Sequence, residues 1–235
     1  MVLNHQWWET HFKQYFMPQL HSLVEVLEHR LLPTFANIES EANEKAEKEW
    51  ERLGSLPARD DIDMSDLAER AFETGLAYYE MMTGLRQGLQ NIFAAALFHL
   101  YEQQAMFFHR REVLHPSEEN DPKLFNHSIF RERLQRFGID VTKFRCWLEL
   151  EELRLVANTV KHAEGDSAKK LHSLRPDLFE APSLGGLSFL GKRSSPRVYS
   201  PLMGEDVYVA VQDLKRYANT VEQFWEELSD AMARV

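Results

Sequence analysis

A continuous helical pattern over residues 65–113 is the feature that most constrains how this chain can fold. Apolar side chains recur there at steps of three and four residues, the spacing that places them on one face of an α-helix. We expect this face to join the core, with the members Leu67, Phe72, Leu76, Tyr79, Leu85, Leu89, Ile92, Phe93, Ala96, Leu100 and Phe107. Gly75, Gly84 and Gly88 weaken the helix, and they allow either a bend or the close approach of a neighbouring helix.

The rest of the chain adds further helical segments. Helices are expected at residues 5–32, 36–53, 126–137, 147–165 and 166–175, and from residue 213 onward. Pro18 kinks the first of these helices or starts its main body, and Pro33 ends it. Residues 207–211 favour a short strand. The pattern predicts an all-α bundle of long antiparallel helices, with at most one short strand pair near the C-terminal region.

Neither an internal repeat nor a clear linker divides the chain, so we expect one domain over residues 1–235. Apolar runs are too short to span a bilayer, and the N-terminus lacks the basic start and apolar core of a secretory signal. We therefore expect a cytoplasmic protein with no membrane partner.

The net charge of −10 argues against broad, sequence-independent binding of nucleic acid, although a small basic pocket remains compatible with it. The densest basic patch, Arg131, Arg133 and Arg136, is either a solvated helix face or a surface for RNA or a partner. The single cysteine, Cys146, excludes an internal disulfide and a cysteine-based zinc site. Because no paired Glu-x-x-His motif is present, we expect no metal and no cofactor.

A row of polar side chains on the helix over 147–165 marks the candidate site. Arg154, Asn158 and His162 recur at four-residue steps and share one side of the helix. We expect the opposite arc to be solvated, with the members Arg145, Glu149, Glu152, Val156 and Thr159. Burying Arg, Asn or His without a partner costs several kcal/mol. The row therefore faces a polar pocket, a buried network or a partner chain, with Glu151 beside Arg154.

Polar side chains also interrupt the apolar end of the helix over 65–113. His99 and Glu102 are the two that bear on the candidate site. They are either exposed or satisfied polar groups of a bundle, or one of them faces the row that contains Arg154.

The segment LRLVANTVKHAEG resembles the HEPN superfamily of small all-helical proteins. The common motif of that superfamily, often written RNxxxHG, lies near the end of a long helix. Asn158 and His162 match its asparagine and histidine, and Ala163 stands where glycine is usual. Ala157 occupies the position of the motif arginine, and Arg154 lies about one turn earlier on the same side of the helix.

This resemblance implies a HEPN-like helical core over residues 64–235, preceded by a helical extension over residues 1–63. It also implies a role in a bacterial antiviral defence or toxin–antitoxin system. Members that cut RNA use no metal, and they pair two chains so that the motifs converge on one phosphate. The expected partners are therefore a second copy of the chain or the other subunits of a complex, together with RNA.

The same resemblance assigns roles to the candidate residues if the chain is a metal-independent ribonuclease. His162 would move a proton as general acid or base. Arg154 and Lys161 would hold the phosphate and offset its charge, and Asn158 would orient the site.

Two other functions remain open. The chain can be a catalytically silent HEPN-like subunit that serves as an interaction module, sensor or antitoxin-like partner. In that case Glu151 or Glu102 pairs with Arg154 in a supporting role, and the polar row is a buried network or a dimer seam. The third alternative is an unrelated helical protein with a metal or small-molecule site.

Overall fold

The computed structural model describes residues 3–56, 63–181 and 197–235. Every regular element within these residues is helical, which confirms an all-α helical bundle. The α-helices are α1 His5–His11, α2 Met17–Val26, α3 Ile38–Gly54, α4 Met64–Phe108, α5 His127–Arg136, α6 Trp147–His162, α7 Asp166–Leu174 and α8 Val211–Met232. In the described parts of the chain, no helix combines the length and the apolar composition that crossing a bilayer requires.

Short π-helical and 3-10 turns connect or extend the N-terminal helices. A π-helical turn at Phe12–Phe16 joins α1 to α2, and Pro18 lies in the first turn of α2. The backbone stays helical from His11 through Met17, so Pro18 does not start a helix but follows a π-helical turn within a continuous one. Pro33 lies in the 3-10 turn Leu32–Phe35, which ends this part of the chain. A further π-helical turn, His109–Val113, extends α4.

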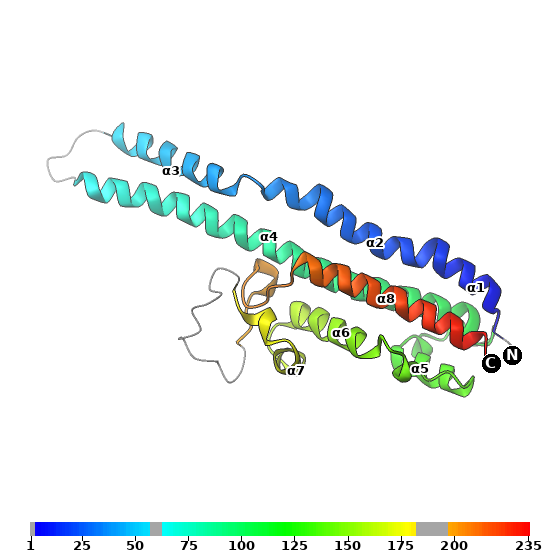
Figure 1. Cartoon of the computed structure of the whole chain (residues 1–235). Helices are drawn as coiled ribbons and strands as arrows, with labels where there is room; N and C mark the ends of the chain where they lie inside the picture. The colour runs from blue at the N-terminus through cyan, green and yellow to red at the C-terminus, as the bar shows by residue number, and fades with distance from the viewer. Residues whose placement is uncertain (1–2, 57–62, 182–196) are drawn as a thin grey trace.

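Helix α4 is the spine of the molecule (Figure 1). Its N-terminal half lies beside α3, and the 3-10 turn Pro201–Met203 approaches it at Gly84, whereas α6 and α8 pack along its C-terminal half. Helices α1 and α2 run along α8, and α1 reaches the end of the bundle where α8 ends. The long helices thus share a core around the C-terminal half of α4, and the other half projects with α3.

Aromatic side chains from three parts of the chain fill the core near that end. The rings of Trp8 and Phe108 lie 4.7 Å apart, and those of Phe12 and Trp225 lie 4.8 Å apart. The indole N–H of Trp225 donates to Gln104 Oε1 at 3.0 Å, which satisfies its one polar group inside the core. The N-terminal helices are therefore part of the same core as α4 and α8.

The predicted core face of α4 is wrong for about half of its members. The exposed ones are Phe72, Leu76, Tyr79, Leu85, Ile92 and Phe107. Different helices pack against the two halves of α4. Helix α3 covers one side of the N-terminal half, whereas α6 and α8 cover another side of the C-terminal half. No single face is buried throughout, and a periodicity read over the whole helix averages two different faces.

Glycines allow close approach along α4, one of the two alternatives that the sequence left open. A Cβ atom at Gly75 would lie 2.8 Å from the carbonyl oxygen of Ala42 in α3. A Cβ atom at Gly88 would lie 2.1 Å from the carbonyl oxygen of Leu202, and Gly84 is approached closely by the same turn. Any larger residue would push these backbones apart.

The strand predicted at residues 207–211 is not formed. Residues 207–210 are extended, but they have no strand partner among the described residues, and Val211 already begins α8. One backbone hydrogen bond is made across to the preceding part of the chain, from Tyr208 to the carbonyl of Leu178 at 2.8 Å. A single bond of this kind does not make a ladder.

A buried asparagine replaces the missing strand partner. The Asn91 side chain is fully buried in α4, and it accepts from the Val209 N–H at 3.2 Å. It donates to the carbonyls of Val207 at 2.8 Å and Pro201 at 2.7 Å. These backbone groups need partners once they are out of water, so Asn91 fixes the approach of the chain to α8.

Candidate functional site

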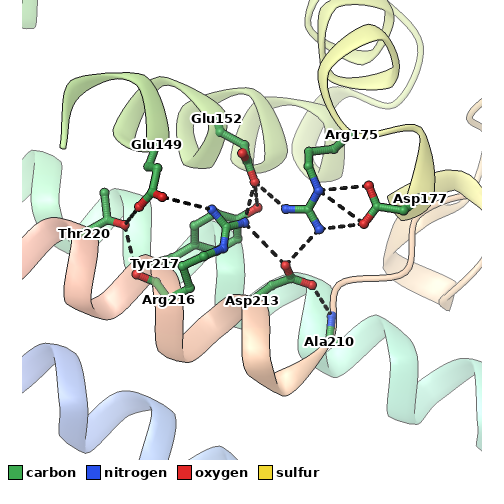
Figure 2. A network of polar contacts seen from close by, with 9 residues as sticks. All are labelled: Glu149, Glu152, Arg175, Asp177, Ala210, Asp213, Arg216, Tyr217 and Thr220. Atoms are coloured by element: carbon green, nitrogen blue, oxygen red, sulfur yellow. Dashed lines mark hydrogen bonds and ion pairs between the residues drawn. The ribbon is translucent and has the colours of Figure 1, made fainter. Parts of the chain in front are cut away.

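A buried carboxylate sets the rotation of α6 about its axis. Glu152 Oε1 accepts from Arg175 Nη1 at 2.6 Å, from Arg216 Nη2 at 2.5 Å and from the Tyr217 hydroxyl at 2.7 Å (Figure 2). Tyr217 and Arg216 belong to α8, and Arg175 follows α7 directly. Glu152 therefore joins three segments through one charged group whose burial is compensated by two guanidinium groups.

A second carboxylate completes this network. Asp213 Oδ1 accepts from Arg175 at 3.0 Å and from Arg216 at 3.4 Å, and its Oδ2 accepts from the Ala210 N–H at 3.1 Å (Figure 2). The last contact caps the N-terminus of α8. Hydrogen bonding to Asp177, which outweighs burial, raises the pKa of Arg175 further above its usual range, so Arg175 remains charged.

The arc of α6 that was predicted to be solvated is instead largely buried. Glu152, Val156 and Thr159 all lie inside the protein, against the prediction. The physical reason is that α8 packs on this side and brings Arg216, which neutralises Glu152. The Thr159 hydroxyl donates to the Leu155 carbonyl at 2.8 Å and needs no outside partner. Sequence periodicity cannot recognise a buried carboxylate whose partners lie far along the chain.

With Glu152 turned toward α8, the opposite side of α6 faces a pocket of about 300 Å³. Ten residues line it: Phe98, Tyr101 and Glu102 from α4, His127 and Arg131 from α5, and Trp147, Leu150, Glu151, Arg154 and Asn158 from α6. Four of the predicted site residues thus line one pocket. Its volume is at the small end of the range for ligand-binding sites.

Arg154 is paired inside this pocket. Its Nε and Nη2 atoms donate to Glu151 Oε2 at 3.0 and 2.9 Å, one turn back on α6. Both side chains are about one-third exposed, at 38% and 34%. An ion pair that exposed contributes about 1 kcal/mol at most, so a stronger anion that reaches the pocket can compete for Arg154.

Glu102 and His127 face each other across the pocket. Glu102 Oε2 lies 2.7 Å from His99 Nδ1, and Glu102 Oε1 lies 3.8 Å from His127 Nε2. His127 Nε2 is buried and has no hydrogen-bond partner among the described residues. Burial lowers the pKa of His127, despite the opposing effect of Glu102. His127 is therefore neutral near pH 7, with a ring nitrogen that is free to bond to a ligand.

Arg131 is the pocket's other guanidinium. It forms no ion pair among the described residues, whereas Arg133 and Arg136 are each paired with a glutamate. The Arg131 guanidinium lies over the Trp147 ring, 5.6 Å from its centroid. Of the three arginines in the basic patch, Arg131 is the one that lines the pocket. A cation–π contact with the Trp147 ring stabilises its guanidinium group there.

Lys161 and His162 do not line the pocket. Both are exposed in the last turn of α6. His162 follows Arg154 by eight residues, which is roughly 12 Å along a helix. Ala157, at the position of the motif arginine, is buried in the core. One chain therefore brings Arg154, Asn158, Glu102 and Glu151 together and leaves His162 apart.

The residue after His162 has an unusual backbone. Ala163 ends α6 with φ at 58°, a conformation that favours glycine over residues with a side chain. A glycine at this position would take the same conformation without strain.

Several residues of the pocket, among them Phe98, Tyr101, His127 and Trp147, could not be found from the sequence pattern. His127 was not singled out, and Trp147 was considered only as the start of the helix. His127 directly follows Asn126, whose side chain accepts from the Ile129 N–H at 3.0 Å and caps α5. That cap signal fixes where α5 begins, but it does not indicate that the first turn of α5 faces α6.

Other reactive groups in the described residues do not form a competing site. Cys146 is buried directly before α6, and burial raises the pKa of its thiol to about 12, so it stays protonated near neutral pH. No group of three or more His, Cys, Asp or Glu side chains is arranged to hold a metal ion in the parts that the structure describes.

Comparisons with protein-family models, with curated proteins and with solved structures find no significant match to this chain. The function must therefore be argued from the pocket itself. It combines aromatic walls with two carboxylates, two guanidinium groups, an amide and a neutral imidazole. Such a lining can bind a small polar ligand or a protein side chain, but it lacks the excess of positive charge that a phosphodiester backbone needs.

Proposed function

We propose that this chain is a HEPN-like helical protein of a bacterial defence or toxin–antitoxin system that acts as a binding subunit and does not cut RNA. The observation that carries this proposal is that Arg154 and His162 do not share a site. Arg154 is paired with Glu151 in a pocket that also contains Glu102, and His162 is exposed about two turns away.

Electrostatics supports the same conclusion. Glu102 and Glu151 offset Arg131 and Arg154, so the pocket is close to neutral. A phosphate would approach two carboxylates as well as two guanidinium groups, on a protein whose net charge is −10. Long-range attraction, which steers nucleic acids to their proteins, is therefore missing.

The end of α6 supports the HEPN-like part of the proposal. Ala163 has a positive φ at the position where the motif has glycine, directly after the matching Asn158 and His162. A glycine would take this conformation without strain, and glycine is the residue that the motif has at this position. Ala157, in contrast, stands at the position where the motif has arginine.

Growth of a bacterial host on induced expression tests this function. Ribonucleases of this kind stop growth when they are expressed without their inhibitor. We expect wild-type protein and His162→Ala to give the same growth curve at the same expression level. Growth arrest by the wild type that His162→Ala relieves would overturn the proposal.

A metal-independent ribonuclease centred on His127 is the second candidate. The specific observation in its favour is that His127 lies in the same pocket as Arg154 and Arg131 and is neutral near pH 7, and its buried Nε2 has no hydrogen-bond partner in the described parts of the chain. A neutral imidazole can accept a proton from a 2′-hydroxyl group. RNA cleavage that His127→Ala and Arg154→Ala abolish, and that His162→Ala leaves intact, would select this candidate.

A further inference from the structure

Helix α3 and residues 64–83 of α4 form a two-helix arm that projects beyond the N-terminus of α8 (Figure 1). The contacts of this part of α4 go to α3: Gly75 approaches Ala42, and the Tyr78 hydroxyl donates to Glu41 at 2.6 Å. One side of the arm's α4 segment is thus packed, and the other sides face outward.

Three large apolar side chains lie on one outward side of the arm. Phe72, Leu76 and Tyr79 follow each other at steps of four and three residues, and their exposed fractions are 66%, 42% and 39%. We call these three residues the arm row. Single exposed apolar residues are common in soluble proteins, but three adjacent ones on one helix face make a candidate contact surface.

The arm row continues a face that is buried elsewhere in α4. At about 100° per residue, Ala94 and Leu97 lie on nearly the same side of the helix as Phe72. Both are fully buried where α6 and α8 pack against α4. The same side of one helix is thus covered by helices in its C-terminal half and open in the arm. A further helix can pack there in the way that α8 packs next to it.

Carboxylates line the free edge of the arm row. Asp66, Glu69, Glu73 and Glu80 fall on the edge that faces away from α3, and all four are exposed. None of them forms an ion pair among the described residues. Arg70 is also exposed on this edge, so four carboxylates and one guanidinium leave a net charge of −3 directly beside an apolar strip. This surface is complementary to a basic amphipathic helix.

We propose that the arm row is the docking site for a basic amphipathic helix from a different protein chain. Its apolar face would cover Phe72, Leu76 and Tyr79, and its lysines or arginines would face the four carboxylates. A second copy of this chain is a poorer occupant, because its own acidic edge would be brought beside this one at a net charge of −10 per chain. The inference rests on the proposed role as a binding subunit, but it uses a surface separate from the pocket.

Fluorescence anisotropy with two labelled model peptides tests the docking site. Both peptides carry leucine on one helix face; one carries lysine elsewhere, and the other carries glutamate. We expect the lysine peptide to bind, and its affinity to fall by at least about tenfold for Leu76→Glu. The matched control is Leu85→Glu, which changes an equally exposed leucine on the opposite side of α4 and should leave the affinity unchanged.

Charge is tested by the triple variant Glu69→Gln, Glu73→Gln and Glu80→Gln, which should reduce the salt dependence of binding. Circular dichroism checks that all variants keep their helices. Equal binding of the two peptides, binding of neither, or equal effects of Leu76→Glu and Leu85→Glu would overturn the proposal.

Two other results would replace the proposed occupant. Sedimentation that finds a wild-type dimer and a Leu76→Glu monomer would assign the arm row to a second copy. Binding to vesicles of zwitterionic lipid that Leu76→Glu abolishes would assign it to a lipid surface. None of these binding measurements depends on RNA cleavage. A failure of the docking proposal is therefore distinguishable from a failure of the proposed function, which is tested by growth and by RNA cleavage.

Discussion

Arg154 and Glu151 are joined through a single carboxylate oxygen, with Nε and Nη2 of the arginine 3.0 and 2.9 Å from Glu151 Oε2. Because both side chains are partly exposed, this pair adds little to stability. Its importance is electrostatic, since it places a negative group at the position where a nuclease would need to receive phosphate. The polar row of α6 is thus internally neutralised on the side that faces the pocket.

Loss of the Glu152 charge should destabilise the fold. In Glu152→Gln, Arg175 and Arg216 lose the carboxylate that they share. Removing one partner of a buried charge network costs about 3 kcal/mol or more. We expect a loss of about that size in the free energy of unfolding, measured by urea denaturation.

Glu149→Gln is the matched control, because Glu149 lies one turn away and its side chain is far more exposed. Its removal should cost less than about 1 kcal/mol. Equal losses for the two variants would contradict the role of Glu152 in setting the rotation of α6.

Asn91→Ala should also be strongly destabilising. The substitution leaves the Val209 N–H and the Val207 and Pro201 carbonyls without their partner. Unsatisfied buried groups cost about 1–3 kcal/mol each, so we expect a loss of at least about 3 kcal/mol in the free energy of unfolding. Asn158→Ala changes the same residue type in another helix, at a side chain that faces the pocket, and should cost under about 0.5 kcal/mol.

Hydrogen exchange at the Val209 amide provides a local check on Asn91. This amide should be protected in the wild type and should exchange faster in Asn91→Ala than in Asn158→Ala. Protection that survives Asn91→Ala would show that Asn91 does not hold residues 207–210.

Ala163→Gly should stabilise the protein. Ala163 has φ 58° and ψ −122°, a region that residues with a Cβ rarely adopt, which costs about 1–3 kcal/mol and is relieved by glycine. We expect a net gain of about 1 kcal/mol in the free energy of unfolding. The control Ala77→Gly lies in an exposed part of α4 and should lose about 1 kcal/mol through helix propensity. A loss of stability in Ala163→Gly would contradict the backbone conformation at the end of α6.

His109 should make stability fall at acidic pH. The side chain is fully buried, and burial lowers its pKa more strongly than the hydrogen bond to the Leu124 carbonyl raises it. Below the unfolded pKa of about 6.5, the unfolded chain binds a proton that the folded chain does not. The free energy of unfolding should therefore decrease as the pH drops below about 6.5.

His109→Gln keeps a donor for the Leu124 carbonyl but cannot be protonated. The loss of stability between about pH 7 and about pH 5 should be smaller in this variant than in the wild type. Urea titrations at several pH values give both slopes. Identical slopes would contradict the neutral, buried state of His109.

The helices themselves could be predicted because apolar spacing, proline and capping residues are local signals. The pattern over residues 65–113 corresponds to α4 and its π-helical extension, and Gly75 marks a real close approach to α3. The extended segment at residues 207–210 was mistaken for a strand because its β-branched residues suit either state. Its hydrogen bonds go to Asn91, which is more than 100 residues away along the chain.

The faces of the helices could not be predicted, because they depend on which helices pack together. Glu152 was expected in solvent, but it is buried together with Val156 and Thr159 on the same arc of α6. The apolar Val156 on this arc was the one local sign of burial. The partners of Glu152, Arg175 and Arg216, are distant in sequence. For the same reason, the sequence indicated Arg154 and Asn158 but gave no means of finding His127 on the facing helix.

Cleavage of a labelled single-stranded RNA in the presence of EDTA tests most directly whether Arg154 and His162 belong to a nuclease site. Purified wild type, Arg154→Ala and His162→Ala are compared at equal concentration, with circular dichroism to check that each is folded. Because Arg154 is paired with Glu151 and separated from His162, all three cleavage rates should equal the rate in buffer alone. Cleavage by the wild type above that rate, abolished by both substitutions, would contradict this account.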